Sequence, residues 1–389
     1  MIRAALLVLL VAQAAHGGAS RVADEPAAGS AGAARATETA QQPPPMHEVV
    51  VVTASRLEQT LDQVPTHTTV LDAEQLQATP ALAIDDALRQ VPGFSLFRRS
   101  SSVVAHPTSQ GVSLRGIGPS GASRTLVLLD GVPLNDPFGG WVYWSRVPKS
   151  SVERVELVRG GGSSAWGSAA LGGVIHLLTR SPADRRLDFA LESGERGTVQ
   201  GDVSYADRRG SFGFQVHASA FDTGGYPVVR ADQRGGIDVP ADSEHRMLGL
   251  RGDLAASDRV RVTSRADAFE EERGNGTPLT GNDTEIASLV GTVDWTTAHS
   301  VVLLRALVHG QEFASAFSSQ QPDRAAEVPA LDQFLVDPEG YGLTVQWSRA
   351  FDSHTVVVGF EGRETTGHTH EDFFLAAGTL QRRRRAGGD

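Results

Sequence analysis

Residues 110–136 read QGVSLRGIGPSGASRTLVLLDGVPLND, and residues 150–179 read SSVERVELVRGGGSSAWGSAALGGVIHLLT. Both stretches place short apolar runs, such as Thr125 to Asp130 and Val174 to Thr179, between glycine-rich segments. Glycine permits tight turns and close backbone approaches, so this pattern predicts a compact domain of short strands. Nothing in either stretch has the residue pattern of an active site.

Four elements in these stretches resemble, in order, the plug domain of the TonB-dependent outer-membrane receptors. The matching residues are Leu114-Arg115-Gly116, Leu129-Asp130-Gly131-Val132-Pro133-Leu134, Val152 to Gly160, and Gly172-Gly173-Val174-Ile175. The resemblance implies uptake of a scarce, bulky nutrient, of the ferric siderophore or cobalamin class, across the outer membrane of a Gram-negative cell. It implies binding and gating without covalent catalysis, so neither a cofactor nor a metal is expected.

The resemblance also implies which plug residues matter. Arg115 and Arg159 occupy motif positions whose arginines pair with barrel glutamates in the family, because a charge in a packed plug needs an opposite partner. Glu156 is an alternative, local partner for these arginines. The full set of plug motif residues is Arg115, Gly116, Asp130, Gly131, Glu156, Arg159, Gly160, Gly172 and Gly173.

The composition of the 389 residues limits the function classes. The chain has room for two domains, and it is 40% hydrophobic and 21% charged. A transmembrane barrel remains compatible with this composition because its strands alternate apolar and polar residues. The net charge of −11 argues against a nucleic-acid partner, and the absence of cysteine excludes disulfides and thiolate chemistry.

The N-terminal region divides into three predicted segments. Residues 1–17 have the basic start and short apolar run of a cleaved signal peptide. Residues 18–46 are rich in Ala, Gly, Thr and Pro and are expected to form a disordered periplasmic tether. Residues 47–54 read HEVVVVTA and look like the family's TonB box, a strand that the TonB energy-transducing protein binds by strand addition. An ordinary first strand of the next domain is the alternative. The predicted contacts of the TonB box are Glu48, Val49, Val50, Val51, Val52 and Thr53.

Residues 55–182 are assigned to the plug, an α/β domain on the periplasmic side of the barrel lumen. Asp72 and Gln75 form a capping box that predicts a helix over Ala73 to Ala78. A second helix is predicted to begin at Thr79-Pro80, to bury Ile84, Leu88 and Val91, and to end at Val91-Pro92-Gly93.

Residues 183–389 are predicted to be antiparallel transmembrane strands, which makes the fold mainly β. Ser211 to Phe221, Arg259 to Phe269 and Val301 to Gly310 alternate apolar and polar residues over the length that a tilted membrane strand needs. Short turns alternate with long polar loops at Asp222 to Glu244, Glu270 to Thr284 and Glu312 to Gly340. Outer-membrane barrels have this alternation, whereas a soluble β-sandwich gives no reason for it.

The number of predicted strands is too small for a plugged barrel. About nine are found, whereas plugged transporters have about 22, and nine strands close to a ring of roughly 18 Å that cannot hold a plug. The residues after Gln381 offer no closing amphipathic strand and no terminal aromatic. The barrel is therefore expected to be truncated and the chain to be a fragment of a monomeric receptor.

Two further groups of residues invite a binding role. His368-Thr369-His370-Glu371-Asp372 contains metal-ligand types, but a solvated loop is the preferred interpretation because two histidines specify little. Aromatic residues gather in a turn-rich plug segment, where they suit either ligand contact or packing against the plug core and barrel wall. The candidate ligand contacts are Phe138, Trp141, Tyr143 and Trp144.

Two other functions stay open at this point. A receptor used for signalling or adhesion would share the fold, and an extra folded domain before the TonB box would favour signalling. A periplasmic β-rich hydrolase would need a nucleophile, base and acid in register, which the sequence does not show.

Overall fold

The computed structural model describes residues 50–51, 59–60, 67–98, 100–117, 123–160, 162–351, 354–375 and 380–388. The chain divides into residues 1–47 and residues 48–389, and all described residues belong to the second unit. The predicted signal peptide and tether lie outside the described residues, as do Glu48, Val49, Val52 and Thr53 of the predicted TonB box. No helix in the described ranges is long and apolar enough to cross a membrane.

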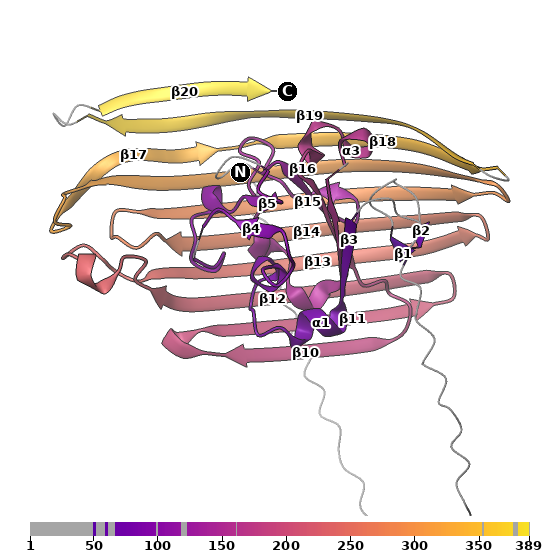
Figure 1. Ribbon diagram of the computed structural model, residues 1–389, viewed down its shortest axis with the longest axis horizontal. Coiled ribbons are helices and arrows are strands. Elements are labelled where there is room, and N and C mark those ends of the chain that lie inside the picture. Colours follow the sequence, from indigo (N-terminus) through magenta and orange to yellow (C-terminus); the bar gives the residue numbers. More distant parts are fainter. Residues whose placement is uncertain are drawn as a thin grey trace, which may run out of the picture. The chain divides into compact units, whose positions relative to one another are not determined.

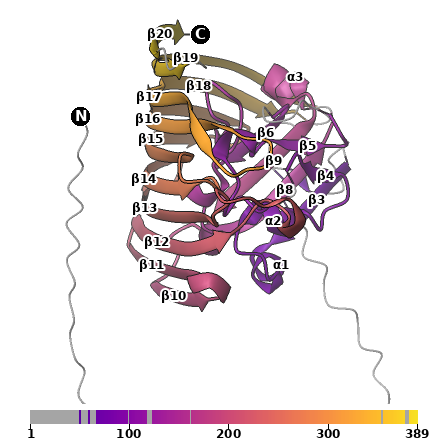
Figure 2. The ribbon, with the colours of Figure 1, turned by 90° about the vertical axis from the view of Figure 1, so that its left-hand side faces the viewer.

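A five-stranded sheet with the order β3-β8-β9-β6-β7 forms the centre of the N-terminal domain; Figure 1 labels β3, and Figure 2 labels β6, β8 and β9 as well. Its strands are β3 (His67–Asp72), β6 (Thr125–Leu129), β7 (Val132–Pro133), β8 (Val152–Arg159) and β9 (Gly173–Thr179). β6 and β9 are parallel, and the other neighbours are antiparallel. The predicted strands from Thr125 and from Val174 are confirmed. All residues of β6 are buried, as is typical of a strand covered on both faces.

Short elements surround this sheet. The capping box is confirmed, because Gln75 N donates to Asp72 Oδ1 at 2.8 Å and Asp72 N donates to Gln75 Oε1 at 3.1 Å. The described helices are α1 (Ala73–Ala78), α2 (Ile84–Leu88) and α3 (Ser163–Trp166), with 3-10 turns η1 (Pro107–Ser109), η2 (Trp144–Arg146), η3 (Lys149–Ser151) and η4 (Ser168–Ala170). Two small sheets pair β1 (Val50–Val51) with β2 (Gln59–Thr60) and β4 (Phe94–Leu96) with β5 (Val112–Leu114).

The second helix is shorter than predicted, because it begins at Ile84 and not at Thr79-Pro80. The carbonyl oxygens of Thr79 and Ala81 accept hydrogen bonds from Lys149 Nζ at 3.0 and 2.9 Å, and Ala83 is extended. Because Thr79 and Ala83 both have an extended backbone, the segment between them connects α1 to α2 and does not begin the helix. The predicted apolar face is confirmed, since Ile84, Leu88 and Val91 all belong to the plug core.

The residues from Arg186 onward form one antiparallel sheet (Figure 2). Its strand order is β10-β11-β12-β13-β14-β15-β16-β17-β19-β18, and β20 pairs with β19. β16 is long enough to pair with β18 through Ser300 to Gly310 and with β17 beyond Phe313. The strands are β10 (Arg186–Ser193), β11 (Val199–Arg209), β12 (Phe212–Tyr226), β13 (Ala241–Ser257), β14 (Val260–Gly274), β15 (Gly281–Thr296), β16 (Ser300–Gln320), β17 (Glu327–Val336), β18 (Glu339–Ala350), β19 (Thr355–Phe374) and β20 (Leu380–Gly388). Turns η5 (Glu195–Gly197) and η6 (Ala231–Gln233) lie in its connections.

Three predictions about this sheet need correction. The sheet has 11 strands, not nine, because β17 forms inside the predicted loop Glu312 to Gly340 and β20 contains the arginine run after Gln381. The predicted long loops are shorter than expected, since their first and last residues continue the ladders of the neighbouring strands. His368 to Asp372 lie in β19 and not in a loop, and the described residues contain no group of metal-ligating side chains that could hold an ion.

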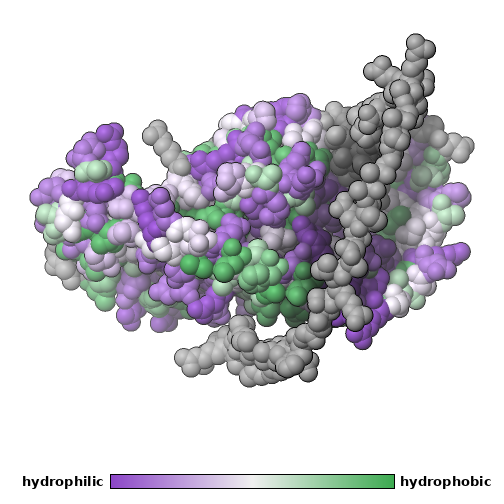
Figure 3. Space-filling model, turned by 90° about the horizontal axis from the view of Figure 1, so that it is seen from below, coloured by the Kyte–Doolittle hydropathy of each residue, from purple (hydrophilic) through white to green (hydrophobic). Residues whose placement is uncertain are grey.

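The two faces of the sheet differ in polarity. On β12, the apolar residues Phe212 and Val216 are exposed, whereas His217 and Ser219 point to the opposite, covered face. β15 repeats the arrangement with exposed Leu289 beside buried Ser288. The apolar face therefore points away from the plug, which is the reverse of a soluble sheet. Figure 3, a view from below, shows hydrophobic side chains toward the middle of this face and hydrophilic ones toward both of its ends.

Candidate functional site

The candidate site is the interface between the plug and the polar face of the 11-stranded sheet. Figure 2 shows the plug lying against one side of this sheet. One apolar cluster crosses the interface, where Tyr143 of the plug packs with Phe269 and Ile286. The contacts on either side of this cluster are hydrogen bonds and ion pairs between buried polar groups.

Asp130 and Gly131 form a plug turn that three arginines of the sheet bind. Arg265 Nη1 on β14 donates to Asp130 Oδ2 at 2.9 Å, and Arg305 Nη1 on β16 donates to Gly131 O at 2.8 Å. Arg251 Nη1 on β13 lies 4.0 Å from the same carboxylate oxygen. The plug holds the carboxylate from its own side, since Thr179 N donates to Asp130 Oδ1 at 2.9 Å. Burial alone would raise the pKa of Asp130, but Arg265, Arg251 and Thr179 outweigh it and lower this pKa below its ordinary value.

The conformation of this turn explains its motif. Asp130 has φ 50° and Gly131 has φ 79°, a left-handed backbone that aspartate tolerates and glycine favours. A Cβ atom on Gly131 would lie 2.3 Å from Arg305 Nη1. The left-handed backbone therefore favours glycine at this position, and a side chain there would also displace the Arg305 guanidinium from its hydrogen bond to Gly131 O.

A second contact continues from the first across the sheet. Arg146 Nη2 of the plug donates to Asp267 Oδ2 and to Ser288 Oγ, each at 2.7 Å. Asp267 also forms an ion pair with Arg265 at 3.0 Å. Opposite charges thus alternate from Arg146 through Asp267 and Arg265 to Asp130, so the two plug contacts belong to one electrostatic network.

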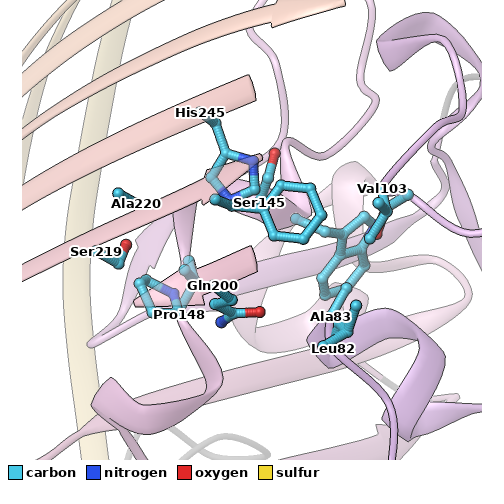
Figure 4. A pocket seen from close by; sticks show the side chains of 13 residues that line it. Leu82, Ala83, Val103, Ser145, Pro148, Gln200, Ser219, Ala220 and His245 are labelled. Carbon is cyan, nitrogen blue, oxygen red and sulfur yellow. The ribbon is translucent and has the colours of Figure 1, made fainter. Parts of the chain in front are cut away.

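A third contact lies nearer the long loops. Arg273 Nη1 donates to the backbone oxygens of Ser102 and Ala105, and Arg273 Nη2 pairs with Glu271, which accepts from Ser145 Oγ. Figure 4 shows the adjacent crevice, of about 30 Å³, where His245 of the sheet lies close to Ser145. The crevice is too small for a nutrient and can hold about one water molecule.

The predicted aromatic residues have different surroundings. Trp144 belongs to the plug core, and Tyr143 packs against the sheet, so the packing interpretation describes both. Phe138 is 41% exposed, and Trp141 lies with its ring centroid 6.3 Å from that of Phe313. Phe138 and Trp141 remain as candidate ligand contacts.

A cavity of about 310 Å³, lined by both apolar and polar groups, lies at the same plug segment, of which Pro137, Gly140 and Tyr143 line it. Asp136 and Tyr143 line it from the plug, and His309 and Gln311 line it from β16. Gln311 Nε2 donates to Asp136 Oδ2 at 2.9 Å and to Tyr143 Oη at 3.2 Å. Burial raises the pKa of Asp136, although the bond from Gln311 opposes this shift. The cavity therefore offers polar groups and space at the plug–sheet interface.

The predicted arginine pair has no acidic partner in the described part of the chain. Arg159 donates to Thr69 Oγ1 at 2.8 Å and also contacts His67, and it is only 4% exposed. Burial and the neighbouring Arg115 lower the pKa of Arg159. Glu156 pairs with Arg154 at 2.8 Å, and its pairing with Arg115 or Arg159 stays a prediction.

The predicted glycines occupy turns and close approaches around this pair. Gly116 and Gly160 have φ 73° and 75°. Gly173 has φ 130°, and a Cβ atom there would lie 2.2 Å from Val158 O. Gly172 approaches the side chain of Thr125, to which an added Cβ atom would lie 2.9 Å.

Only Val50 and Val51 of the predicted TonB box are described. They form β1, which pairs antiparallel with β2 through Val50↔Thr60 and Val51↔Gln59. The segment is therefore a strand that already has one partner within the chain.

Sequence reasoning missed the sheet residues that bind the plug. Arg251, Arg265, Asp267, Arg273 and Arg305 all lie on the polar face of their strands. A charged residue on that face of an alternating strand was an available signal. The plug residue that each of these side chains contacts could not be predicted, because no local sequence pattern indicates how two segments far apart in the chain align.

A sequence profile described as the TonB-dependent Receptor Plug Domain matches residues 60–174. The vitamin B12 transporter BtuB of Vibrio vulnificus (strain CMCP6) is 36% identical over 132 residues, which cover 34% of this chain and 20% of that protein. The vitamin B12 transporter BtuB of Photobacterium profundum is 29% identical over 167 residues, covering 43% of this chain and 26% of that protein. The chain thus spans about a quarter or less of these relatives.

Solved structures share the fold over most of this chain. P. aeruginosa FpvA bound to heterologous pyoverdines has a TM-score of 0.64 at 13% identity and covers 84% of this chain and 45% of its own. The ferric yersiniabactin uptake receptor FyuA from Yersinia pestis has a TM-score of 0.54 at 15% identity and covers 83% of this chain and 60% of its own. The plug followed by antiparallel strands is therefore the architecture of these receptors.

Proposed function

We propose that this chain, a member of the TonB-dependent receptor family through its plug domain, provides the plug and barrel strands of an outer-membrane receptor for active nutrient uptake. The observation that carries the proposal is the polarity of the sheet, whose polar face binds the plug while its apolar face is exposed. A sheet in water would bury its apolar face, whereas an outer-membrane barrel turns it toward lipid.

The outward residues of β15 show the width of this apolar face. Ala287, Leu289, Gly291, Val293 and Trp295 follow one another on one side of the strand. At about 3.3 Å per residue and a tilt of about 40°, they span roughly 20 Å, close to the apolar band of an outer-membrane barrel. Trp295 stands at the short-turn end, where an interfacial aromatic residue belongs.

The other end of the band is acidic. Glu285 faces Glu270 across β14 and β15, and Asp283 faces Glu272. Like charges directly opposite each other destabilise a sheet unless water screens them, so these pairs belong outside the bilayer on the long-loop side. We therefore assign the short turns to the opposite, periplasmic side.

The plug then acts as the gate of the receptor. Most of its attachments to the sheet, apart from the apolar contact at Tyr143, are hydrogen bonds and ion pairs that water can replace, so a pull on the plug can open a path along the interface. We assign the pull to TonB, which would add a strand to the Val49–Thr53 segment and compete with, or extend, its pairing with β2. The reaction is binding and mechanical gating without covalent catalysis.

The nutrient belongs to the ferric siderophore or cobalamin class, which the names of the relatives and of the solved receptors support. Phe138, Trp141 and the cavity lined by Asp136 and Gln311 are the groups that we propose to meet it. Aromatic surfaces with a few polar groups suit a bulky nutrient with an apolar body.

The membrane assignment is tested with arginine at two outward positions of β15. Leu289→Arg places a charge in the apolar band and should lower the stability of the refolded chain in lipid vesicles by about 2–4 kcal/mol. Glu285→Arg is the matched control, and it should be neutral or stabilising because it removes the repulsion with Glu270. Equal stabilities of the two variants would remove the basis of the proposal.

The TonB contact is tested by binding, because the chain spans only part of its relatives' length and uptake needs the whole receptor. The chain is refolded in detergent and titrated with purified TonB. Val51→Pro removes a backbone donor of β1 and should abolish binding, whereas Val51→Thr should retain it. Binding that is unchanged by Val51→Pro would exclude strand addition at this segment.

A further inference from the structure

Two arginines of the sheet stand directly opposite each other at the Asp130 turn. Arg251 on β13 and Arg265 on β14 are cross-strand partners, and their side chains are 18% and 11% exposed. Like charges in such a pair repel, more strongly where water is excluded. The sheet therefore gains stability when an anion lies between them.

The sheet aspartates neutralise only one side of each guanidinium. Asp253 lies 3.1 Å from Arg251 Nε, and Asp267 lies 3.0 Å from Arg265 Nε. The Nη1 atoms point to the plug instead, where Arg265 Nη1 binds Asp130 Oδ2 and Arg251 Nη1 donates to Thr179 Oγ1 at 2.8 Å. Arg305 adds a third Nη1 donor to the same turn, at Gly131 O.

We infer that Arg251, Arg265 and Arg305 form an oxyanion-binding site on the polar face of the sheet, and that the carboxylate of Asp130 is its tethered occupant. Guanidinium groups match carboxylate and phosphate oxygens through paired N–H donors and keep their charge at all relevant pH values. The site accordingly takes a carboxylate or phosphate group when Asp130 leaves it.

The attachment of Asp130 to the same chain explains why its carboxylate fills the site in the closed state. A group attached to the same folded chain competes with an effective concentration of about millimolar or more, so a dilute free anion does not displace it. This step rests on the proposed function: movement of the plug exposes the site to a nutrient that carries a carboxylate or phosphate group. Such a nutrient would bind the arginines while Asp130 is withdrawn and would be released when Asp130 returns.

The test vacates the site and offers a small anion in place of Asp130. Asp130→Gly removes the carboxylate, and glycine accepts the left-handed backbone at this position. The full 389-residue chain is refolded in detergent, and its thermal unfolding midpoint is measured in sodium formate and in sodium chloride at matched ionic strength. We expect formate to restore at least half of the midpoint loss in Asp130→Gly and to leave the unsubstituted chain unchanged relative to chloride.

The matched control is the double variant Asp130→Gly/Arg265→Gln, which lacks the principal donor and should show no difference between formate and chloride. Equal midpoints of Asp130→Gly in the two salts, or equal rescue in the double variant, would overturn the inference. If Asp130→Gly does not fold in chloride, the yield of refolded chain is the readout. Recovery in formate alone supports the site, and recovery in neither salt overturns it.

This experiment is independent of the membrane test. Rescue by formate together with equal stabilities of Leu289→Arg and Glu285→Arg would leave the site standing and remove the basis of the proposed function. A lower stability of Leu289→Arg without rescue by formate would refute the site and leave the proposed function intact.

Discussion

The plug core and the plug–sheet interface are built from different kinds of contact. The core packs buried aliphatic and aromatic side chains such as Leu88, Trp144, Leu157 and Ile175 around the five-stranded sheet. The interface joins the plug to the larger sheet mostly through arginines, carboxylates and hydroxyl groups. Water cannot replace apolar packing, but it can replace a hydrogen bond to a charged group at a net cost of about 1.5–3 kcal/mol. A moderate pull should therefore separate the interface before it unfolds the plug core.

The largest effect is expected from a cavity in the plug core. Leu157 is fully buried on β8, and Leu157→Ala should lower the free energy of unfolding of the plug by about 2–5 kcal/mol. Hydrogen exchange followed by mass spectrometry would show faster exchange in β8 and β9, while β13 and β14 should be unchanged. Leu187→Ala, the same truncation at a residue that is 70% exposed on β10, is the control. Equally fast exchange in the larger sheet would contradict a separate plug core.

The second-largest predicted effect is a loss of stability at acidic pH, and it depends on a histidine in the middle of the five-stranded plug sheet. His176 on β9 lies opposite Glu156 on β8, its ring nitrogens have no hydrogen-bond partner among the described residues, and it is 4% exposed. Burial lowers the pKa of His176 to about 4; Asp130 opposes this shift, and Arg305 and Arg154 add to it. The unfolded chain, with a histidine pKa near 6.5, binds more protons between these values, so stability is lost as the pH falls from about 6.5 to 4.

This loss amounts to about 3 kcal/mol at pH 4 relative to pH 7. It is measured as the difference between the unsubstituted chain and His176→Leu, from urea unfolding of the plug across this pH range. The difference is needed because Asp85, whose pKa burial raises to about 6, acts in the opposite direction, and because His106, with a pKa lowered to about 4 by burial, acts in the same direction. Parallel pH profiles for the two chains would show that His176 is solvated.

The two regions also differ in how far the sequence predicts them. The plug strands, the capping box at Asp72 and the turn at Asp130-Gly131 follow from local patterns, because apolar periodicity and positive φ are properties of neighbouring residues. The alternation along β12 and β14 likewise predicted which face is apolar. The prediction of a helix from Thr79 was wrong because the segment is extended at Thr79 and Ala83, where contacts with Lys149, a residue far along the chain, hold it.

The interface could not be predicted to the same degree. Arg146 and Asp267 are 121 residues apart, and nothing near either residue indicates the other. β17 was missed because a proline and several polar residues made Glu327 to Val336 resemble a loop, and its pairing with both β16 and β19 overrides that local preference. Motif positions were therefore easier to find than their partners.

The smallest effect concerns one ion pair of the interface. Arg146 and Asp267 are both buried, and a double-mutant cycle with Arg146→Gln and Asp267→Asn should give a coupling energy of about 0.5–3 kcal/mol for plug–sheet stability. The coupling energy stays moderate because Asp267 still forms its ion pair with Arg265 when Arg146 is replaced. Arg146→Gln alone should increase hydrogen exchange of η2 and of the Asp130 turn, while the core strand β8 remains protected.

The matched control separates the position of an ion pair from its charge. Arg186 and Asp188 form a pair of similar length, 2.7 Å, on β10, but their side chains are 54% and 41% exposed. The cycle Arg186→Gln with Asp188→Asn should give no more than about 0.5 kcal/mol, because water screens an exposed pair. Equal coupling in the two cycles would mean that the interface is as hydrated as the outer surface. The plug would then be held by its apolar contact at Tyr143 and Phe269, and the charged network would contribute nothing that a pull must break.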